Sequence, residues 1–355
     1  MRKFNKNQAT TGSSKDIFIY FLIFATTLFS VNPSLSAEPL SKISEEIELI
    51  TIEANTTNMF EAERYDEIDI MHGKYLKTKE KTSNGSWKLA YLGSSLFKLA
   101  DKEIPIEGYW DDHEERAKTW IALNPSSSIA HLVYAKLLID RAWMYRGDGW
   151  DQGVELEDWD KFYRYIAKAR KHLTVNEKEA KNDPQFYQLM LTIAKLEGWS
   201  LSEFNALLDE AVARYPSFYP IYFAASDYFS PKWHGSHIAF ENFARRITTL
   251  TESLEKKSIY ARIYWHAYRT IYGADLFVGS AIDWKYMRQS MDDVLAQYPS
   301  QWNINHFAYF SCLAGDAPTT KKLIADIAPQ PIRYAWKYNE NFLKCKNWSE
   351  TQLRL

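Results

Sequence analysis

The chain has 355 residues and a net charge of −2 at pH 7, and 46% of its residues are hydrophobic and 25% charged. This is the composition of a folded soluble protein, and the near-neutral charge provides no basic field to attract nucleic acid. Aromatic residues are abundant at 15%, with 13 Trp and 23 Tyr, so a large aromatic core is expected.

Residues 1–37 have the pattern of a secretory signal peptide. Basic residues precede the apolar run Ile17–Val31, and small residues at Ser36 and Ala37 follow it. A positive region, an apolar region and a small-residue cleavage site are the three parts of such a signal. We expect cleavage near Ala37, a periplasmic or extracellular location, and a single helical domain over residues 38–355.

An uncleaved anchor is the alternative. Residues 17–37 carry no charge and are just long enough to span a bilayer. In that case the protein stays anchored to the inner membrane, and only in that case is the membrane a partner.

Apolar residues recur at helical spacing along the rest of the chain. No stretch alternates at a period of two over five residues or more, so an all-α protein is predicted. Helices are expected near residues 41–60, 61–76, 87–100, 110–123, 126–145, 162–173, 185–198, 201–216, 217–229, 238–250, 258–272, 284–297, 302–313, 319–327 and 333–342.

Proline pairs punctuate these helices in a recurring way. Asn-Pro or Tyr-Pro ends one apolar pattern at Pro125, Pro216 and Pro299, and a new pattern starts at once. Pro184 and Pro216 are 32 residues apart, close to the roughly 34-residue tetratricopeptide unit. The other spacings are irregular. We therefore predict an irregular TPR-like array of helical hairpins, an α-solenoid, from about Ser41 to the C-terminus.

Three short motifs carry a resemblance to a known family. Asn84-Gly85-Ser86-Trp87, the run from Trp143 to Gly149 and the run from Pro231 to Ser236 are similar to motifs of an uncharacterised bacterial family of exported tetratricopeptide-like proteins. That family is the domain of unknown function numbered four-zero-three-four. The resemblance extends over roughly residues 58–348. It implies a TPR-like fold and export, and it implies no established activity.

Two loops are the candidate ligand-binding region. Arg146 to Gly153 and Ser230 to Ser236 are Trp- and Gly-containing breaks between helices, and loops of an array usually collect on one face. We expect them to lie close together. The possible ligand-facing residues are Trp143, Arg146, Trp150, Lys232 and Trp233. Alternatively, Arg146 or Lys232 caps carbonyls at the end of a helix.

The sequence lacks the common catalytic and cofactor-binding motifs. The sequence has no His-Glu-x-x-His, no Gly-x-Ser-x-Gly and no P-loop, so no catalytic residue and no cofactor is expected. His234, His237 and Glu241 have spacings from which a zinc site can be drawn, but His234 belongs to a loop before the helix. A cap and loop role is the better interpretation, and no metal is expected.

Two further polar patterns have ordinary structural explanations. Arg146-Gly147-Asp148 spells an adhesion tripeptide, yet a helix end needs a Gly in the left-handed position and a turn residue after it. The acidic residues between Glu155 and Asp160 lack the spacing of a calcium loop. They suit the start of a helix, where the dipole favours negative charge.

Cys312 and Cys345 are the only cysteines. An exported protein with an even count can form a disulfide, and a separation of 33 residues is nearly one repeat. Equivalent positions on packed helices lie about 8–10 Å apart between axes, whereas a bridge needs Cα atoms within about 7 Å. A disulfide and two independent buried cysteines therefore both remain open.

Two functions from different classes fit these observations. A stacked hairpin array presents a long surface for protein or peptide recognition, so a non-enzymatic binding scaffold of the bacterial cell envelope with an unknown partner is preferred. The alternative is an exported α-helical carbohydrate-active enzyme or sugar binder that uses aromatic platforms and paired carboxylates. Exposure in a cleft beside two carboxylates would favour the sugar function. The residues to examine are Trp143, Trp150, Trp159 and Trp233.

Overall fold

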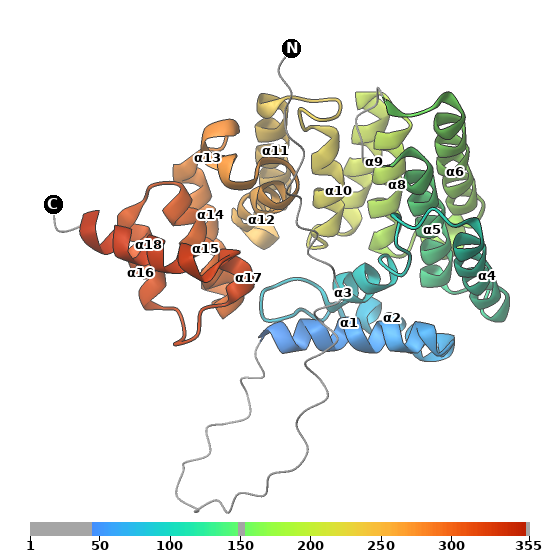
Figure 1. The fold of residues 1–355 in the computed structure, drawn as a ribbon, viewed down its shortest axis with the longest axis horizontal. Coiled ribbons are helices and arrows are strands. Elements are labelled where there is room, and N and C mark those ends of the chain that lie inside the picture. The colour runs from blue at the N-terminus through green and yellow to red at the C-terminus, as the bar shows by residue number, and fades with distance from the viewer. Residues whose placement is uncertain (1–44, 148–152, 353–355) are drawn as a thin grey trace, which may run out of the picture. The chain divides into compact units, whose positions relative to one another are not determined.

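A computed structural model describes residues 45–147 and 153–352, and this part of the chain is helical throughout (Figure 1). It contains an isolated bridge between Lys81 and Trp87 and no strand, so the all-α prediction is confirmed. The elements are α1 (Glu45–Glu61), α2 (Tyr65–Thr78), α3 (Lys88–Leu96), α4 (Glu107–Leu123), α5 (Ser128–Arg146), α6 (Leu156–Val175), α7 (Glu177–Ala180), α8 (Pro184–Leu196), α9 (Leu201–Arg214), α10 (Pro220–Tyr228), α11 (His237–Glu255), α12 (Ser258–Ala267), a π-helix (Tyr268–Tyr272), a 3-10 turn (Gly273–Asp275), α13 (Leu276–Gly279), α14 (Trp284–Gln297), α15 (Gln301–Leu313), α16 (Ala317–Ala325), α17 (Arg333–Trp336) and α18 (Asn339–Gln352).

Side-chain caps begin many of these helices where the sequence indicates. Ser236, the expected cap of α11, accepts a hydrogen bond from Ala239 N at 3.1 Å. Ser200 and Glu203 form a reciprocal capping box at α9, and Asp183 caps α8 with Pro184 in the first turn. Each cap satisfies a backbone N–H that has no partner inside its helix. The helix boundaries therefore follow from local chemistry.

From α4 onward, helices pack on their neighbours in chain order (Figure 1). The closest pairs are α4 with α5, α5 with α6, α8 with α10, α11 with α12, α12 with α14, and α15 with α16. A continuous hydrophobic core runs between them, and it is rich in fully buried Trp, Tyr and Phe side chains. This packing between successive neighbours is that of a helical-repeat array.

Two helix predictions in the C-terminal half were partly wrong. The helix expected over residues 333–342 is split into α17 and α18, because Lys337 adopts a positive φ of 60° and breaks the backbone pattern. The helix expected over residues 258–272 is α-helical only to Ala267 and continues as a π-helix. A π-helical turn inside an α-helix is frequently found at a functional site.

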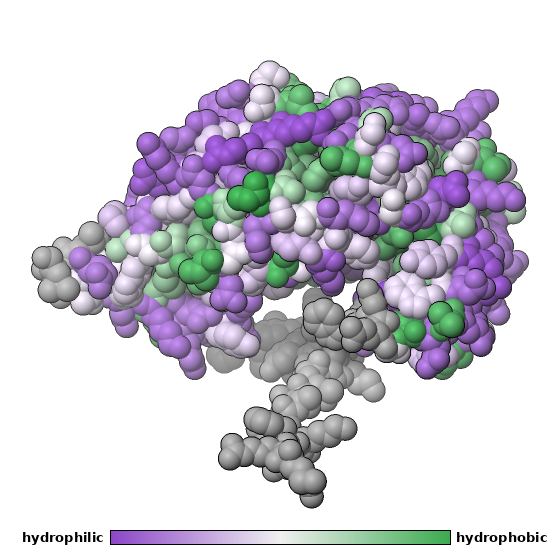
Figure 2. Space-filling model, turned by 90° about the horizontal axis from the view of Figure 1, so that it is seen from above, coloured by the Kyte–Doolittle hydropathy of each residue, from purple (hydrophilic) through white to green (hydrophobic). Residues whose placement is uncertain are grey.

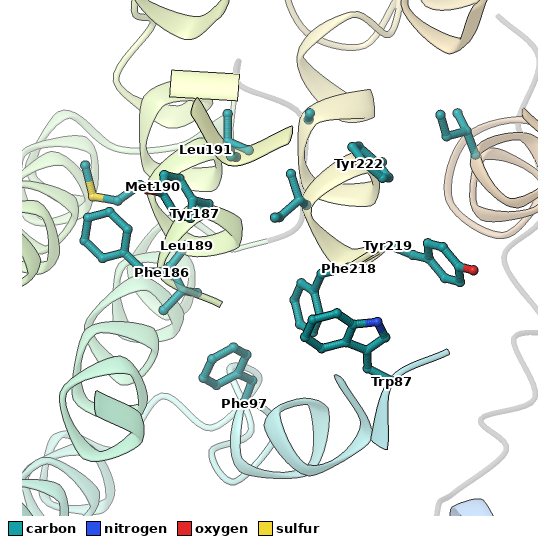
Figure 3. Close-up of a cluster of buried hydrophobic side chains, with 14 of the residues drawn as sticks. Trp87, Phe97, Phe186, Tyr187, Leu189, Met190, Leu191, Phe218, Tyr219 and Tyr222 are labelled. Carbon is teal, nitrogen blue, oxygen red and sulfur yellow. The ribbon is translucent and has the colours of Figure 1, made fainter. Parts of the chain in front are cut away.

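The N-terminal elements, α1 to α3 and the loops between them, lie against the inner helices of the array, which are α8, α10, α12 and α15. Trp87, at the start of α3, packs edge-on against Phe218 before α10, with ring centroids 5.5 Å apart (Figure 3). Nearby, Lys81 Nζ donates to Tyr298 OH at 2.8 Å and lies 3.4 Å from a Glu255 carboxylate oxygen. The segment before α3 therefore reaches residues more than 170 positions away, which its helical pattern alone did not indicate.

Cys312 on α15 and Cys345 on α18 form a disulfide in the structure, with Cα atoms 5.7 Å apart. The helices are close enough because both also pack against α16. The bond joins the last helix to the array.

The predicted signal peptide and the alternative anchor over residues 17–37 lie outside the described residues. No helix within the described ranges combines the length and the apolar character needed to cross a membrane.

Candidate binding groove

A groove with a volume of about 750 Å³ lies between the N-terminal elements and the inner helices of the array. Its lining comes from α1, residues 84–98, α5, α8, α10, α12, the π-helix, α15 and α17. A groove of this size is in the range of ligand-binding sites. On the face seen in Figure 2, by contrast, hydrophilic residues predominate and hydrophobic ones form small scattered groups.

Helical spacing brings the lining residues to one face of each inner helix. Gln188 and Thr192 are one turn apart on α8. Tyr219, Phe223 and Asp227 follow the same four-residue spacing at α10. Residues three or four apart share a helix face, so each helix buries its apolar side in the core and turns a polar and aromatic stripe toward the groove.

One end of the groove is aromatic. Phe223 stacks on His266, with ring centroids 4.8 Å apart and an interplanar angle of 8°. Trp302 stacks on Tyr334, with ring centroids 5.4 Å apart and an interplanar angle of 19°, and Trp265 packs against His306 and Phe307 of α15. Four of these rings therefore cover one another in pairs and present their remaining faces and edges to the groove.

The histidines at this end are uncharged at neutral pH. Burial lowers the pKa of His266 to about 4, with Asp227 opposing this shift. Burial also lowers the pKa of His306, which packs against Trp265 at 4.1 Å, to about 3. Of the two, His266 is the one that lines the groove, where it contributes a flat surface and no positive charge.

The fixed charges of the lining are mostly positive. Lysines in the groove have carboxylates nearby: Lys98 Nζ is 3.9 Å from Glu53, and Lys136 pairs with Asp140. The groove carboxylate Asp227 is paired with Lys195 at 2.8 Å. Arg262 and Arg269 also line the groove, and within the described residues neither guanidinium has a carboxylate within 4 Å.

Arg262 lies at the floor of the groove and is only 5% exposed. It donates one hydrogen bond, from Nη2 to Asn84 O at 2.9 Å, and its guanidinium lies 4.3 Å from the centroid of the Tyr219 ring. Asn303 Nδ2 donates to the same Asn84 oxygen at 3.2 Å. In the part of the chain that the structure describes, Nε of Arg262 and Oδ1 of Asn303 have no hydrogen-bond partner, so this polar floor is incompletely satisfied.

Gly85 allows this floor to assemble. Its φ is +94°, and a Cβ at this position would lie 2.6 Å from Arg262 Nη2 and 2.6 Å from Tyr298 Cδ2. The preceding Asn84 side chain holds the turn by accepting from Ser86 N at 3.0 Å. The Asn-Gly-Ser-Trp motif is therefore the turn that carries a backbone carbonyl to Arg262 and Asn303.

The residues predicted to face a ligand lie elsewhere. Trp143, which lies on α5 before the first predicted loop, packs edge-on against Trp233 of the second, with ring centroids 6.4 Å apart. Arg146 donates to Gly147 O at 3.1 Å and lies 5.0 Å from the ring centroids of both Trp143 and Trp159, as in the capping alternative. Lys232 is exposed. None of these residues lines the groove, and Trp150 lies outside the described residues.

The three residues considered for zinc have separate partners. His234 Nε2 bonds to Lys195 O at 3.1 Å, and His237 Nδ1 bonds to Tyr272 OH at 3.1 Å. Glu241 accepts hydrogen bonds from the hydroxyls of Tyr260 and Tyr264. No group of three His, Cys, Asp or Glu suited to a metal ion is found in the ranges that the structure describes.

Sequence reasoning missed the groove residues, although one signal was present. Arg262 interrupts the apolar run Ser258–Ala267, in which all the remaining side chains except Trp265 and His266 are buried. A charged residue inside such a run needs a partner or a function. Its position beside Asn84 was not visible, because the two residues are 178 positions apart.

Comparison with known proteins adds one match. No curated protein and no solved structure matches the chain. Residues 53–180 match the family model described as a domain of unknown function, DUF4034. This range includes the Asn84 and Trp143 motifs but neither the third motif, at Pro231–Ser236, nor Arg262. The predicted resemblance is confirmed over residues 53–180.

Proposed function

We propose that this protein is a non-enzymatic binding scaffold of the bacterial cell envelope whose groove holds an extended segment of a partner protein. The supporting observation is that successive inner helices, α8, α10, α12 and α15, all contribute to one groove. A ligand that contacts all of them has to be elongated. A peptide segment meets this requirement, and helical-repeat arrays commonly bind peptides along such a surface.

The groove carboxylates favour binding over hydrolysis. Glycosidases need one carboxyl group that stays protonated and a second that is free to act as base or nucleophile. Asp227 is instead paired with Lys195 at 2.8 Å, and Glu53 lies near Lys98. The aromatic rings also favour this view, because Tyr334 covers one face of Trp302 and reduces the flat area on which a sugar ring stacks.

A groove-filling variant tests the proposal. Ala224 is half-buried on α10 and lines the groove, so Ala224→Trp should obstruct it. Ala206→Trp on α9, an exposed position outside the groove, is the matched control. A phage-displayed library of random ten-residue peptides is selected on the purified wild-type chain, and binding of the enriched peptides is measured by fluorescence anisotropy.

Enriched peptides should bind the wild-type chain and the Ala206→Trp control and lose at least about tenfold in affinity on Ala224→Trp. Failure to enrich any peptide, or enrichment that Ala224→Trp leaves unchanged, contradicts the proposal. Binding and turnover of neutral oligosaccharides in the groove would instead support the sugar function.

A further inference from the structure

We infer that the groove is specific for an acidic peptide segment, whose side-chain carboxylates pair with Arg262 and Arg269. This inference rests on the groove being the peptide-binding site proposed above. Its basis is the distribution of charge. The chain as a whole is slightly acidic, yet the groove is lined by two lysines, two arginines and only two carboxylates.

The arginines differ from the lysines in having no counter-charge. Each groove lysine has a carboxylate from the chain itself within 4 Å, whereas no carboxylate in the described part of the chain lies within 4 Å of either Arg262 or Arg269. Arg262 is buried whereas Arg269 is exposed, and a buried guanidinium is costly unless it is paired and hydrogen-bonded. A carboxylate of the ligand would supply the missing partner.

Geometry sets the spacing of the acidic residues. Arg262 and Arg269 are seven residues apart, about two helical turns or roughly 10 Å along the axis. An extended peptide covers this distance in about three residues, at roughly 3.3–3.6 Å each. Alternate side chains of an extended peptide point to the same face, so two acidic side chains two or four residues apart match both arginines. Arg269 is already oriented by its hydrogen bond to Tyr334 OH, which holds the guanidinium beside the aromatic end.

The chain itself leaves the polar floor incompletely satisfied. Among the described residues, Arg262 Nε is a buried donor without an acceptor and Asn303 Oδ1 is a buried acceptor without a donor, while Asn303 Nδ2 donates to the carbonyl oxygens of Asn84 and Tyr298. A ligand carboxylate at Arg262 would therefore meet a guanidinium that donates to a carbonyl oxygen of the chain and has no carboxylate within 4 Å in the described ranges.

The first test varies the peptide. The groove-dependent peptides enriched from the library are synthesised with acetylated and amidated ends, once with their Asp and Glu residues and once with Asn and Gln in their place. We expect Asp and Glu to dominate the enriched sequences, and the neutral versions to bind at least about tenfold more weakly. Affinity should also fall as salt is raised. Because the peptide is changed and not the protein, misfolding of a variant does not confuse this result.

The second test varies the protein. Arg269 is exposed, so Arg269→Gln should lower the affinity for acidic peptides about threefold. Arg262 lies at the floor of the groove, so Arg262→Gln should lower this affinity about tenfold or more. Both should bind the neutral peptides as the wild-type chain does. Arg164→Gln removes an exposed arginine on α6 that does not line the groove and should change neither affinity. Circular dichroism checks that each variant is folded.

Distinct results overturn the inference. Groove-dependent peptides that are neutral or basic would contradict the acidic specificity while leaving the groove proposal intact. Equal binding of neutral peptides that carry a free C-terminal carboxylate would assign the arginines to a chain end and not to side chains. Binding of polygalacturonate in place of any peptide would assign the groove to an acidic polysaccharide. Loss of all groove-dependent binding would contradict both proposals.

Discussion

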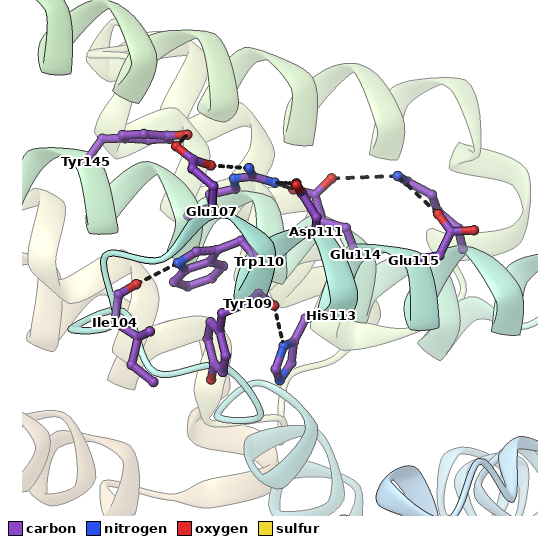
Figure 4. A network of polar contacts seen from close by, with 11 residues as sticks. Ile104, Glu107, Tyr109, Trp110, Asp111, His113, Glu114, Glu115 and Tyr145 are labelled. Carbon is purple, nitrogen blue, oxygen red and sulfur yellow. Dashed lines mark hydrogen bonds and ion pairs between the residues drawn. The ribbon is translucent and has the colours of Figure 1, made fainter.

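Two arginines of this protein, Arg141 and Arg262, are equally buried at 5% exposure, but they differ in whether the chain places carboxylates beside them. Arg141 on α5 forms ion pairs with Glu107, Asp111 and Glu114 of α4 (Figure 4). Burial by itself lowers the pKa of Arg141, but hydrogen bonds to these carboxylates raise it above its ordinary value. Arg262 has no carboxylate within 4 Å in the described ranges.

The difference separates a charge that the chain neutralises itself from the charge that we propose to bind a ligand. Glu107, Asp111 and Glu114 follow α-helical spacing on one face of α4, so the chain provides the counter-charges of Arg141 as soon as α4 and α5 pack. Arg262 instead meets a carbonyl and two tyrosine rings, which hold the guanidinium in place without neutralising it. This contrast is the reason for placing a ligand's negative charge at Arg262 and not at Arg141.

Neutralising each arginine in turn should give the largest difference between the two sites in the free energy of unfolding. Arg141→Gln leaves Glu114, whose side chain is 10% exposed, without its partner, and the free energy of unfolding should fall by about 3–5 kcal/mol. Arg262→Gln removes one hydrogen bond to a carbonyl and should cost only about 1–2 kcal/mol. Chemical denaturation measures both.

A double variant provides the control for this prediction. Adding Glu114→Gln to Arg141→Gln should recover part of the lost stability, because the buried unpaired carboxylate is then neutral. Equal costs for the two arginines would mean that Arg262 has a hidden structural counter-charge.

Acid should destabilise the region around His306 on α15 and the α4–α5 ion-pair network in different pH ranges. In the unfolded chain, His306 takes up a proton near its ordinary pKa of 6.5, whereas burial keeps the folded pKa at about 3. Stability is therefore complete above pH 6.5 and is lost as pH falls, by roughly 3 kcal/mol at pH 4. In the α4–α5 network, the hydrogen bond from Tyr145 lowers the pKa of Glu107 below its ordinary 4.5, so that contribution is lost only at more acidic pH.

Hydrogen exchange at pH 6.5, 5 and 4 checks this order. Amides of α12 and α15 should lose protection before those of α4 and α5. His306→Phe should flatten the decline between pH 6.5 and 4, and simultaneous loss of protection in both regions would contradict the assignment.

Gly85→Ala is expected to act on the groove floor and not on the α4–α5 network. The positive φ of Gly85 and the close approach of its position to Arg262 and Tyr298 should cost about 1–3 kcal/mol. Displacement of the turn should also weaken acidic peptides without affecting the α4–α5 network. The control is Gly73→Ala on α2, where a Cβ meets nothing within 4 Å. That substitution should stabilise the helix by roughly 0.5–1 kcal/mol, and a comparable gain at Gly85 would rule out this role of the turn.

The sequence alone determined the class of fold and most of the helices. Proline and glycine breaks, caps such as Ser236 and apolar residues at helical spacing act within about four residues along the chain, so their effects can be predicted locally. The split at Lys337 and the π-helix after Ala267 were not predicted. No strong local signal marks either of them, and tertiary contacts decide which helix breaks are tolerated.

Only the tertiary structure revealed the groove that we propose as the binding site. Sequence reasoning pointed to Trp143 and Trp233, because Trp-containing loops are conspicuous in a sequence, and the structure places them in contact with each other and away from the groove. The floor of the groove joins Asn84 to Arg262 and Asn303 across 178 and 219 residues. Helical periodicity assigns each residue to a face of its own helix, but it carries no information about which distant face will lie opposite.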